Sequence, residues 1–140
     1  MVIVPTGLTI GVLAILLAVT PVPATAQTDT LYICTNPGSS RVVDIGIAIC
    51  DALPTDALAQ RLKPDNLQRR EGVLITAVVP DSVAQIAGLQ PGDLVYRVGG
   101  VNVEENVETA ARLSLIADSA DTVVNFLRNG RPYRVKIRQR

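Results

Sequence analysis

The chain contains no histidine among its 140 residues. Neither a Ser-His-Asp triad nor a Cys-His nucleophile pair can be assembled from a chain without histidine. Zinc sites that use histidine are excluded for the same reason, and two cysteines are too few for a four-cysteine site. The sequence therefore predicts a protein that is not an enzyme and that has no metal ion or other cofactor.

Neither charge sign is in excess, and aromatic residues are scarce. The 13 basic and 13 acidic residues give a formal net charge of zero. Nucleic-acid binding depends on neutralising phosphates with a basic surface, so the sequence gives no reason to expect a nucleic-acid partner. Aromatic residues make up 3% of the chain and apolar residues 48%, so the core must come from Val, Ile, Leu and Ala. At this length we expect one domain.

The N-terminal segment, residues 1–26, has no charged side chain. Its apolar run, residues 8–19, is followed by two prolines and an Ala-Thr-Ala sequence. This order is typical of a secretory signal peptide, here cleaved after Ala26. The run of about a dozen residues is short against the roughly 20 that a membrane-spanning helix needs. We therefore expect a periplasmic or secreted mature chain. The alternative is an uncleaved segment that anchors the chain to a membrane in the envelope.

The only two cysteines are Cys34 and Cys50, with 15 residues between them. Export would place this even pair in an oxidising compartment, where we expect a disulfide. A bridge of this span would stabilise the fold by about 3 kcal/mol. The alternative is a pair of reduced, buried cysteines.

Short β-branched and apolar segments, separated by turn residues, predict six strands. They cover residues 31–34, 41–50, 72–79, 94–98, 122–127 and 133–138. A helix is expected between its N-cap Thr55 and the stop at Pro64, a second over 83–87 with Ser82 as its cap, and a third over 106–116. The first two strands predict a hairpin that brings Cys34 towards Cys50, and the last strand alternates, which predicts that Tyr133 faces inward. The fold class expected is mainly β (α+β): a small antiparallel barrel or sandwich of five to six strands, capped by two to three helices.

Residues 72–103 carry the most specific pattern in the chain. An apolar strand runs into Pro80, a short helix of small residues ends at Gly88, and a Pro-Gly-Asp turn leads to a strand that turns at Gly99-Gly100. This order, with its Ala-Gly-Leu-x-Pro-Gly-Asp core, resembles the PDZ domain of HtrA/Deg-type proteins of the bacterial envelope. The resemblance covers roughly residues 42–138.

The resemblance divides the chain into three parts. We expect a signal peptide over 1–26, an N-terminal strand or hairpin extension over 27–41, and a PDZ domain over 42–140. The protease domain that usually precedes this type of PDZ domain is not expected here.

A carboxylate-binding loop precedes the groove strand in this permuted PDZ class, and the matching stretch begins at Asp44. The resemblance implies that the backbone N–H groups of Ile45, Gly46 and Ile47 receive the C-terminal carboxylate of a peptide. The residues implied for the groove are Ala48 and Ile49 on the strand and Asn106, Ala110 and Leu113 on the helix opposite. The structural alternative is a core strand with a glycine bulge.

A PDZ domain implies recognition of other proteins. We expect an exported module that binds C-termini or extended segments of envelope proteins by β-strand addition, as an adaptor or quality-control accessory. Its partners would be protein or peptide C-termini with an apolar last residue. The alternative is a structural or assembly component, similar to PDZ domains of secretion systems, whose groove is unused or filled by its own chain. The segment expected to fill the groove is residues 31–34.

Overall fold

The structure is a computed structural model, and it describes residues 30–36, 40–103, 105–114 and 121–138. The predicted signal peptide lies outside these residues. Within the described part of the chain, none of the helices is both long and apolar enough to cross a membrane.

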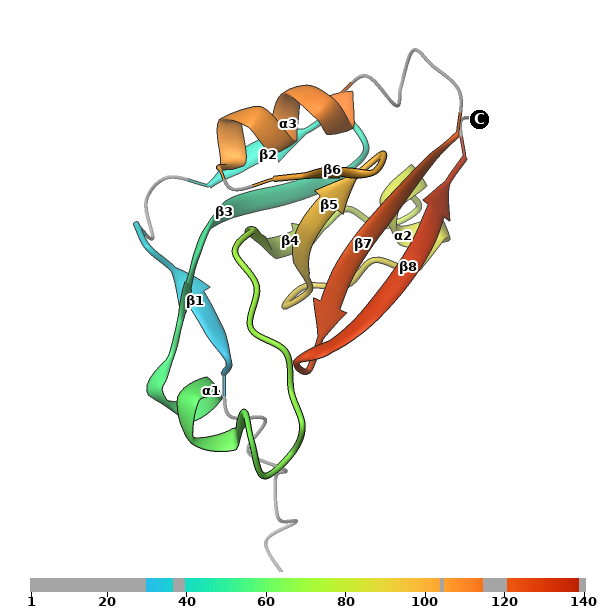
Figure 1. The fold of residues 1–140 in the computed structure, drawn as a ribbon. Helices are drawn as coiled ribbons and strands as arrows, with labels where there is room; N and C mark the ends of the chain where they lie inside the picture. Colours follow the sequence, from blue (N-terminus) through green and yellow to red (C-terminus); the bar gives the residue numbers. More distant parts are fainter. Residues whose placement is uncertain (1–29, 37–39, 104, 115–120, 139–140) are drawn as a thin grey trace, which may run out of the picture.

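Eight strands and three short helices make up the described fold (Figure 1). The strands are β1 (Tyr32–Cys34), β2 (Arg41–Val43), β3 (Ile47–Pro54), β4 (Val73–Val78), β5 (Leu94–Val98), β6 (Val101–Asn102), β7 (Thr122–Arg128) and β8 (Arg131–Ile137). The helices are α1 (Asp56–Arg61), α2 (Val83–Ala87) and α3 (Asn106–Ser114). All strand pairs are antiparallel, in the order β1-β3-β4-β5-β7-β8, while β2 also pairs with β3 and β6 with β5. The predicted fold class is confirmed.

The central strands are apolar on both faces because each face covers a separate core. On β4, the side chains of Val73 and Ile75 enter a larger core together with α2 and α3, whereas Leu74 enters a smaller core with β1 and α1. This alternation follows from the two-residue period of a strand. Burial on both faces holds for these three residues, whereas the next two, Thr76 and Ala77, are exposed.

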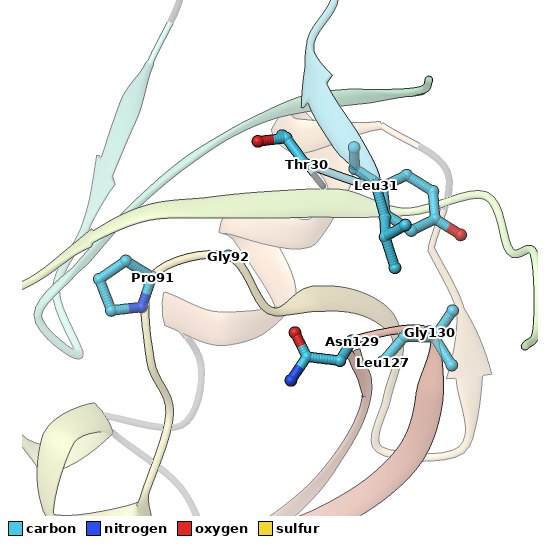
Figure 2. Close-up of a pocket in the computed structure, with 8 residues that line it drawn as sticks. Thr30, Leu31, Pro91, Gly92, Leu127, Asn129 and Gly130 are labelled. Carbon is cyan, nitrogen blue, oxygen red and sulfur yellow. The ribbon is translucent and has the colours of Figure 1, made fainter. Parts of the chain in front are cut away.

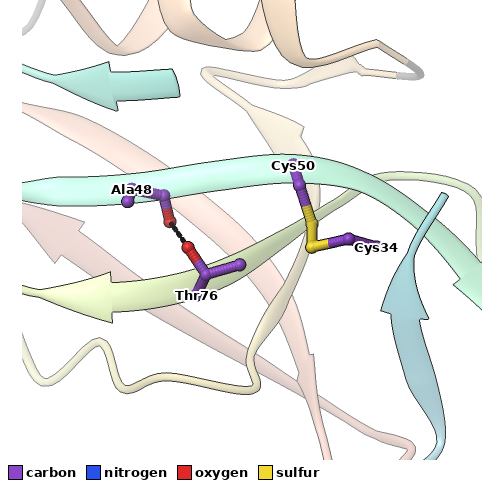
Figure 3. Close-up of a disulfide and its surroundings, with 4 residues drawn as sticks. All are labelled: Cys34, Ala48, Cys50 and Thr76. Atoms are coloured by element: carbon purple, nitrogen blue, oxygen red, sulfur yellow. Dashed lines mark hydrogen bonds between the residues drawn. A yellow bond between two sulfur atoms is a disulfide. The ribbon is translucent and has the colours of Figure 1, made fainter. Parts of the chain in front are cut away.

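The disulfide between Cys34 and Cys50 is present, as predicted (Figure 3). The sulfur atoms are 2.00 Å apart and the Cα atoms 5.6 Å apart. The predicted hairpin partner differs, however. β1 pairs with the far end of β3, where Cys34 lies opposite Ala52, rather than with residues 41–50. Leu31 and Tyr32 thus pack into the smaller core on one face of the sheet.

A buried ion pair fixes the loop between α2 and β5. Asp93 is 1% exposed, and its carboxylate accepts hydrogen bonds from the Arg128 guanidinium at 2.7 and 2.8 Å and from the Gln90 backbone N–H at 2.8 Å. The Arg128 guanidinium also donates to the carbonyl of Gly88 at 2.7 Å. The hydrogen bonds to Asp93 raise the pKa of Arg128 further above its usual value, so the guanidinium stays charged. Asp93 is therefore a structural residue of the turn.

Candidate functional site

The segment predicted as one strand over residues 41–50 is divided by a turn, so that prediction was wrong. Asp44, Ile45 and Gly46 form a three-residue connection between β2 and β3. Gly46 has a φ of +96°, and its backbone N–H donates to the carbonyl of Val43 at 2.9 Å. This is the geometry of a short hairpin in which a left-handed glycine forms a bulge.

The turn is held against the rest of the fold by its backbone. The carbonyl of Gly46 accepts from the Val79 N–H at 2.8 Å, and the carbonyl of Ile45 accepts from the Ala84 N–H at 3.1 Å. A Cβ atom on Gly46 would lie 2.2 Å from the Cβ of Ser82, which no real side chain tolerates. Glycine is therefore required here for its backbone conformation and for space.

Strand β2 lies along the edge of β3 to which the resemblance assigns a bound peptide. Its cross-strand pairs are Arg41 with Ile49, Val42 with Ala48, and Val43 with Ile47. The opposite edge of β3 pairs with β4 over the same residues (Figure 1). Helix α3 packs against β2 as well as β3. The place between β3 and α3, where the resemblance puts a peptide, is thus filled by residues 41–43 of the chain itself.

The two valines of β2 have opposite environments. Val43 is 2% exposed and belongs to the larger core, whereas Val42 is 76% exposed. Five of the residues predicted for the loop and groove lie in the same core: Ile45, Ile47, Ile49, Ala110 and Leu113. The side chain of Val43 therefore anchors β2 to the site by apolar burial.

The two remaining predicted site residues are Ala48 on β3 and Asn106 at the start of α3. Ala48 is half-buried, and its carbonyl accepts from the hydroxyl of Thr76 at 3.2 Å (Figure 3). Asn106 begins α3, but its side chain lies outside the described residues. The part played by all of these residues in binding a ligand stays a prediction.

Sequence reasoning missed Val43 and named the wrong segment as the one that could fill the groove. Residues 31–34 pair with residues 52–54 instead. A signal for the correct arrangement was present, because Asp44 and Gly46 are turn residues that follow a β-branched pair at the spacing of a three-residue hairpin.

Two other kinds of site are possible in the described part of the chain: a metal site and a second pocket. No group of three or more potential metal ligands comes together among the described residues. A separate hollow of about 310 Å³ lies between the start of β1 and two turns, at 91–92 and 129–130 (Figure 2). Its lining consists of Thr30, Leu31, Tyr32, Pro91, Gly92, Leu127, Asn129 and Gly130. None of these side chains is charged, and we assign the hollow no function.

Comparison with known proteins identifies the domain. Residues 74–127 match a family profile described as PDZ domain. A probable periplasmic serine protease of the do/HhoA type from Haemophilus influenzae is 26% identical over 80 residues, which are 57% of this chain and 17% of that protein. The periplasmic pH-dependent serine endoprotease DegQ from Escherichia coli is 26% identical over 83 residues, which are 59% of this chain and 18% of that protein.

The fold has a counterpart among solved structures. The crystal structure of the HtrA3 PDZ domain with a phage-derived ligand (FGRWV) superposes with a TM-score of 0.53 at 17% identity, covering 73% of this chain and 90% of that one. This chain spans less than a fifth of the length of either protease, and the match to both falls on their PDZ regions. The chain therefore carries a PDZ domain that is homologous to the PDZ regions of HtrA- and DegQ-type proteases.

Proposed function

We propose that this chain is a protein-recognition module of the bacterial envelope. It binds C-termini or extended segments of envelope proteins by β-strand addition between β3 and α3, and serves as an adaptor or quality-control accessory. One observation carries the proposal. A short extended strand, β2, already pairs with β3 there, and its last residue is buried in an apolar core. The site therefore has the shape and chemistry that suit an extended segment with an apolar end.

The relatives support two parts of the proposal: the kind of ligand, and the periplasmic or secreted location of this protein. PDZ modules of this type bind peptides, and the ligand of the HtrA3 PDZ domain ends in Val. The last residue of β2 is also a valine, Val43. Two relatives are described as periplasmic, which agrees with the secretory signal expected over residues 1–26. We propose partners with an apolar last residue and a periplasmic or secreted location.

Isothermal titration with short peptides ending in Val, Leu or Phe tests the proposal. Two neighbouring residues of α3 provide matched variants, because Ala110 is buried in the core beside β2 whereas Ala111 is exposed. Ala110→Phe would fill the site and is expected to weaken binding at least about ten-fold, which is about 1.4 kcal/mol. Ala111→Phe adds the same ring to the solvent side and should leave the affinity unchanged.

The two variants also define what would contradict the proposal. Equal affinities for Ala110→Phe and Ala111→Phe, with both proteins folded by circular dichroism, would place the peptide elsewhere. Amidated peptides serve as the control for the role of the terminal carboxylate, and they should bind more weakly than the free acids.

A second candidate function is a structural or assembly component whose groove is permanently filled by its own chain. The position of β2 favours this candidate, because both edges of β3 are paired over residues 47–49. The two functions differ in one respect: an assembly component would bind none of the peptides, even when β2 is weakened.

A further inference from the structure

We infer that β2 is an exchangeable internal ligand: a partner's C-terminus enters between β3 and α3 only after residues 41–43 have left, and it then takes over the contacts of Val43. This inference rests on the proposed function and adds the regulation of the same site. In the structure as it stands, a partner strand has no free edge of β3 to join over residues 47–49, because β2 and β4 pair with its two edges.

The backbone of β2 makes the contacts expected of a bound C-terminus. It runs antiparallel to β3, and its C-terminal end lies at the glycine turn. The Val43 carbonyl oxygen accepts from the Gly46 N–H at 2.9 Å. An incoming carboxylate oxygen would replace this carbonyl at the same N–H group. The internal strand therefore competes with a partner for both the strand edge and the amide.

β2 is short and is anchored by a single side chain, which makes exchange feasible. It has three residues, of which Arg41 and Val42 are exposed and Val43 is buried. The side chain that must leave the core is thus one valine, and a partner with an apolar last residue would refill the same space. When an apolar side chain of the partner replaces that of Val43, most of the buried apolar area is conserved.

Fixed points on either side of β2 keep the exchange local. On one side, Cys34 is bonded to Cys50 of β3. On the other, the carbonyls of Ile45 and Gly46 are held by the N–H groups of Ala84 and Val79. β2 can therefore detach without loss of either fixed point. Because it stays tethered close to the site, its effective concentration there is high, and it competes strongly with a partner.

The contacts of β2 also specify the partner. The residue that replaces Val43 should be small and β-branched, because the cavity it vacates is the size of valine. The residue before it would take the place of Val42 and face solvent, so it should contribute little to selectivity. We expect Val as the preferred last residue, with a larger Phe binding less tightly.

Two valine variants, measured by fluorescence anisotropy with a labelled peptide ending in Val, test the inference. Val43→Ser removes the anchor of β2. Val42→Ser is the control, because it makes the same substitution at the preceding residue, which is exposed to solvent. The apparent affinity equals the intrinsic affinity multiplied by the fraction of molecules in which the site is open. Because loss of the anchor raises that fraction, Val43→Ser should bind at least about ten-fold more tightly than the unmodified chain. Val42→Ser should bind like the unmodified chain.

A third variant, a double cysteine substitution, keeps Val43 in the core. Val42 and Ala48 are cross-strand partners and neither is fully buried, so Val42→Cys/Ala48→Cys can lock β2 to β3 with a disulfide. The locked protein should not bind the peptide, and a reducing agent should restore binding to the level of the reduced unmodified chain. This variant decides the question if Val43→Ser does not fold.

The outcomes separate the two proposals. If both serine variants bind equally, β2 is not an internal ligand and the proposed function stands. If the locked protein binds as tightly as the unmodified chain, β2 is again not an internal ligand; peptide recognition stands, but at a place other than the edge of β3 that β2 occupies. If no protein binds any peptide, including a folded Val43→Ser, the proposed function fails and the inference fails with it.

Discussion

At the scale of single residues, Gly46 determines the shape of the site. It shares its backbone conformation with Gly88, since their φ angles are +96° and +99°, but it differs in surroundings. An added Cβ would collide with Ser82 at Gly46, whereas at Gly88 nothing lies within 4 Å. Comparing the two glycines therefore separates two destabilising effects of an added side chain: the strain of the left-handed backbone and the steric overlap with neighbouring atoms.

Replacing each glycine by alanine should destabilise the fold to different extents. Gly88→Ala pays for the left-handed conformation alone, about 1–2 kcal/mol. Gly46→Ala adds overpacking against α2, so we expect a total loss of about 2–5 kcal/mol. Urea unfolding followed by circular dichroism measures both values. Equal losses would show that the turn is not packed against Ser82 as described.

Tyr32 gives the protein a pH dependence in the alkaline range. Its side chain is 6% exposed, and its hydroxyl accepts from the Arg70 N–H at 3.2 Å. Burial raises the pKa of Tyr32 above its ordinary value of 10.0. The folded state thus favours the neutral phenol. This stabilisation is fully present below the unfolded pKa and is lost as the pH rises through the folded pKa.

The free energy of unfolding should therefore fall between about pH 8 and about pH 11 more steeply in the unmodified chain than in Tyr32→Phe. At the lower pH the variant should be about 1 kcal/mol less stable, because the Arg70 N–H loses its acceptor. Urea unfolding at both pH values gives the comparison. Parallel losses in the two proteins would contradict the assignment to Tyr32.

At the scale of elements, the disulfide joins β1 to β3. Cys50 is fully buried in the smaller core with Leu31 and Tyr32. In the paired variant Cys34→Ala/Cys50→Ala, the unfolded chain regains the freedom of the closed loop, and we expect a loss of about 3 kcal/mol. Chemical unfolding of the oxidised protein, the reduced protein and this variant provides the test. The reduced protein and the variant should agree, and a variant as stable as the oxidised protein would contradict the account.

Elements whose ends are marked by capping residues were predictable from the sequence. Elements that are defined by pairing between distant segments were not. Thr55 and Ser82 cap α1 and α2, as their hydroxyls accept from backbone N–H groups three residues on. By contrast, residues 41–50 are mostly apolar apart from Arg41, Asp44 and Gly46, and this composition suits both a bulged glycine turn and an uninterrupted strand. The turn residues Asp44 and Gly46 favour the first, and the pairing of β2 with β3 is what establishes it.

The edge of the sheet produced a second difference of this kind. Tyr133 alternates with inward-facing residues but is 48% exposed. β8 pairs with β7 at the end of the strand order, so less of the fold covers its side chains. The ring of Tyr133 instead stacks on Phe126, with centroids 5.9 Å apart. Strict alternation of apolar and polar residues along a strand predicts which face of the sheet a side chain is on. Whether that side chain is buried depends on which other elements cover that face.

At the scale of the whole molecule, each face of the sheet covers a core, and the two cores are formed by different parts of the sequence. The larger core, with α2 and α3, belongs to the PDZ pattern that the motif of residues 87–93 predicted. The smaller core depends on β1 and α1, which precede the matched region of 74–127. The residues that gather at the site followed from the resemblance, but the occupant of the site did not. That occupant is set by a competition between β2 and a partner, which no local pattern records.

The central claim is that β2 occupies the place of a peptide and gives way to one. Nuclear Overhauser contacts between Val43 and Ile47, its cross-strand partner, test it most directly. The free protein should show these contacts, and they should disappear as a peptide ending in Val is titrated to saturation. Contacts that persist in the saturated complex would contradict the claim, because the peptide and β2 would then occupy different places.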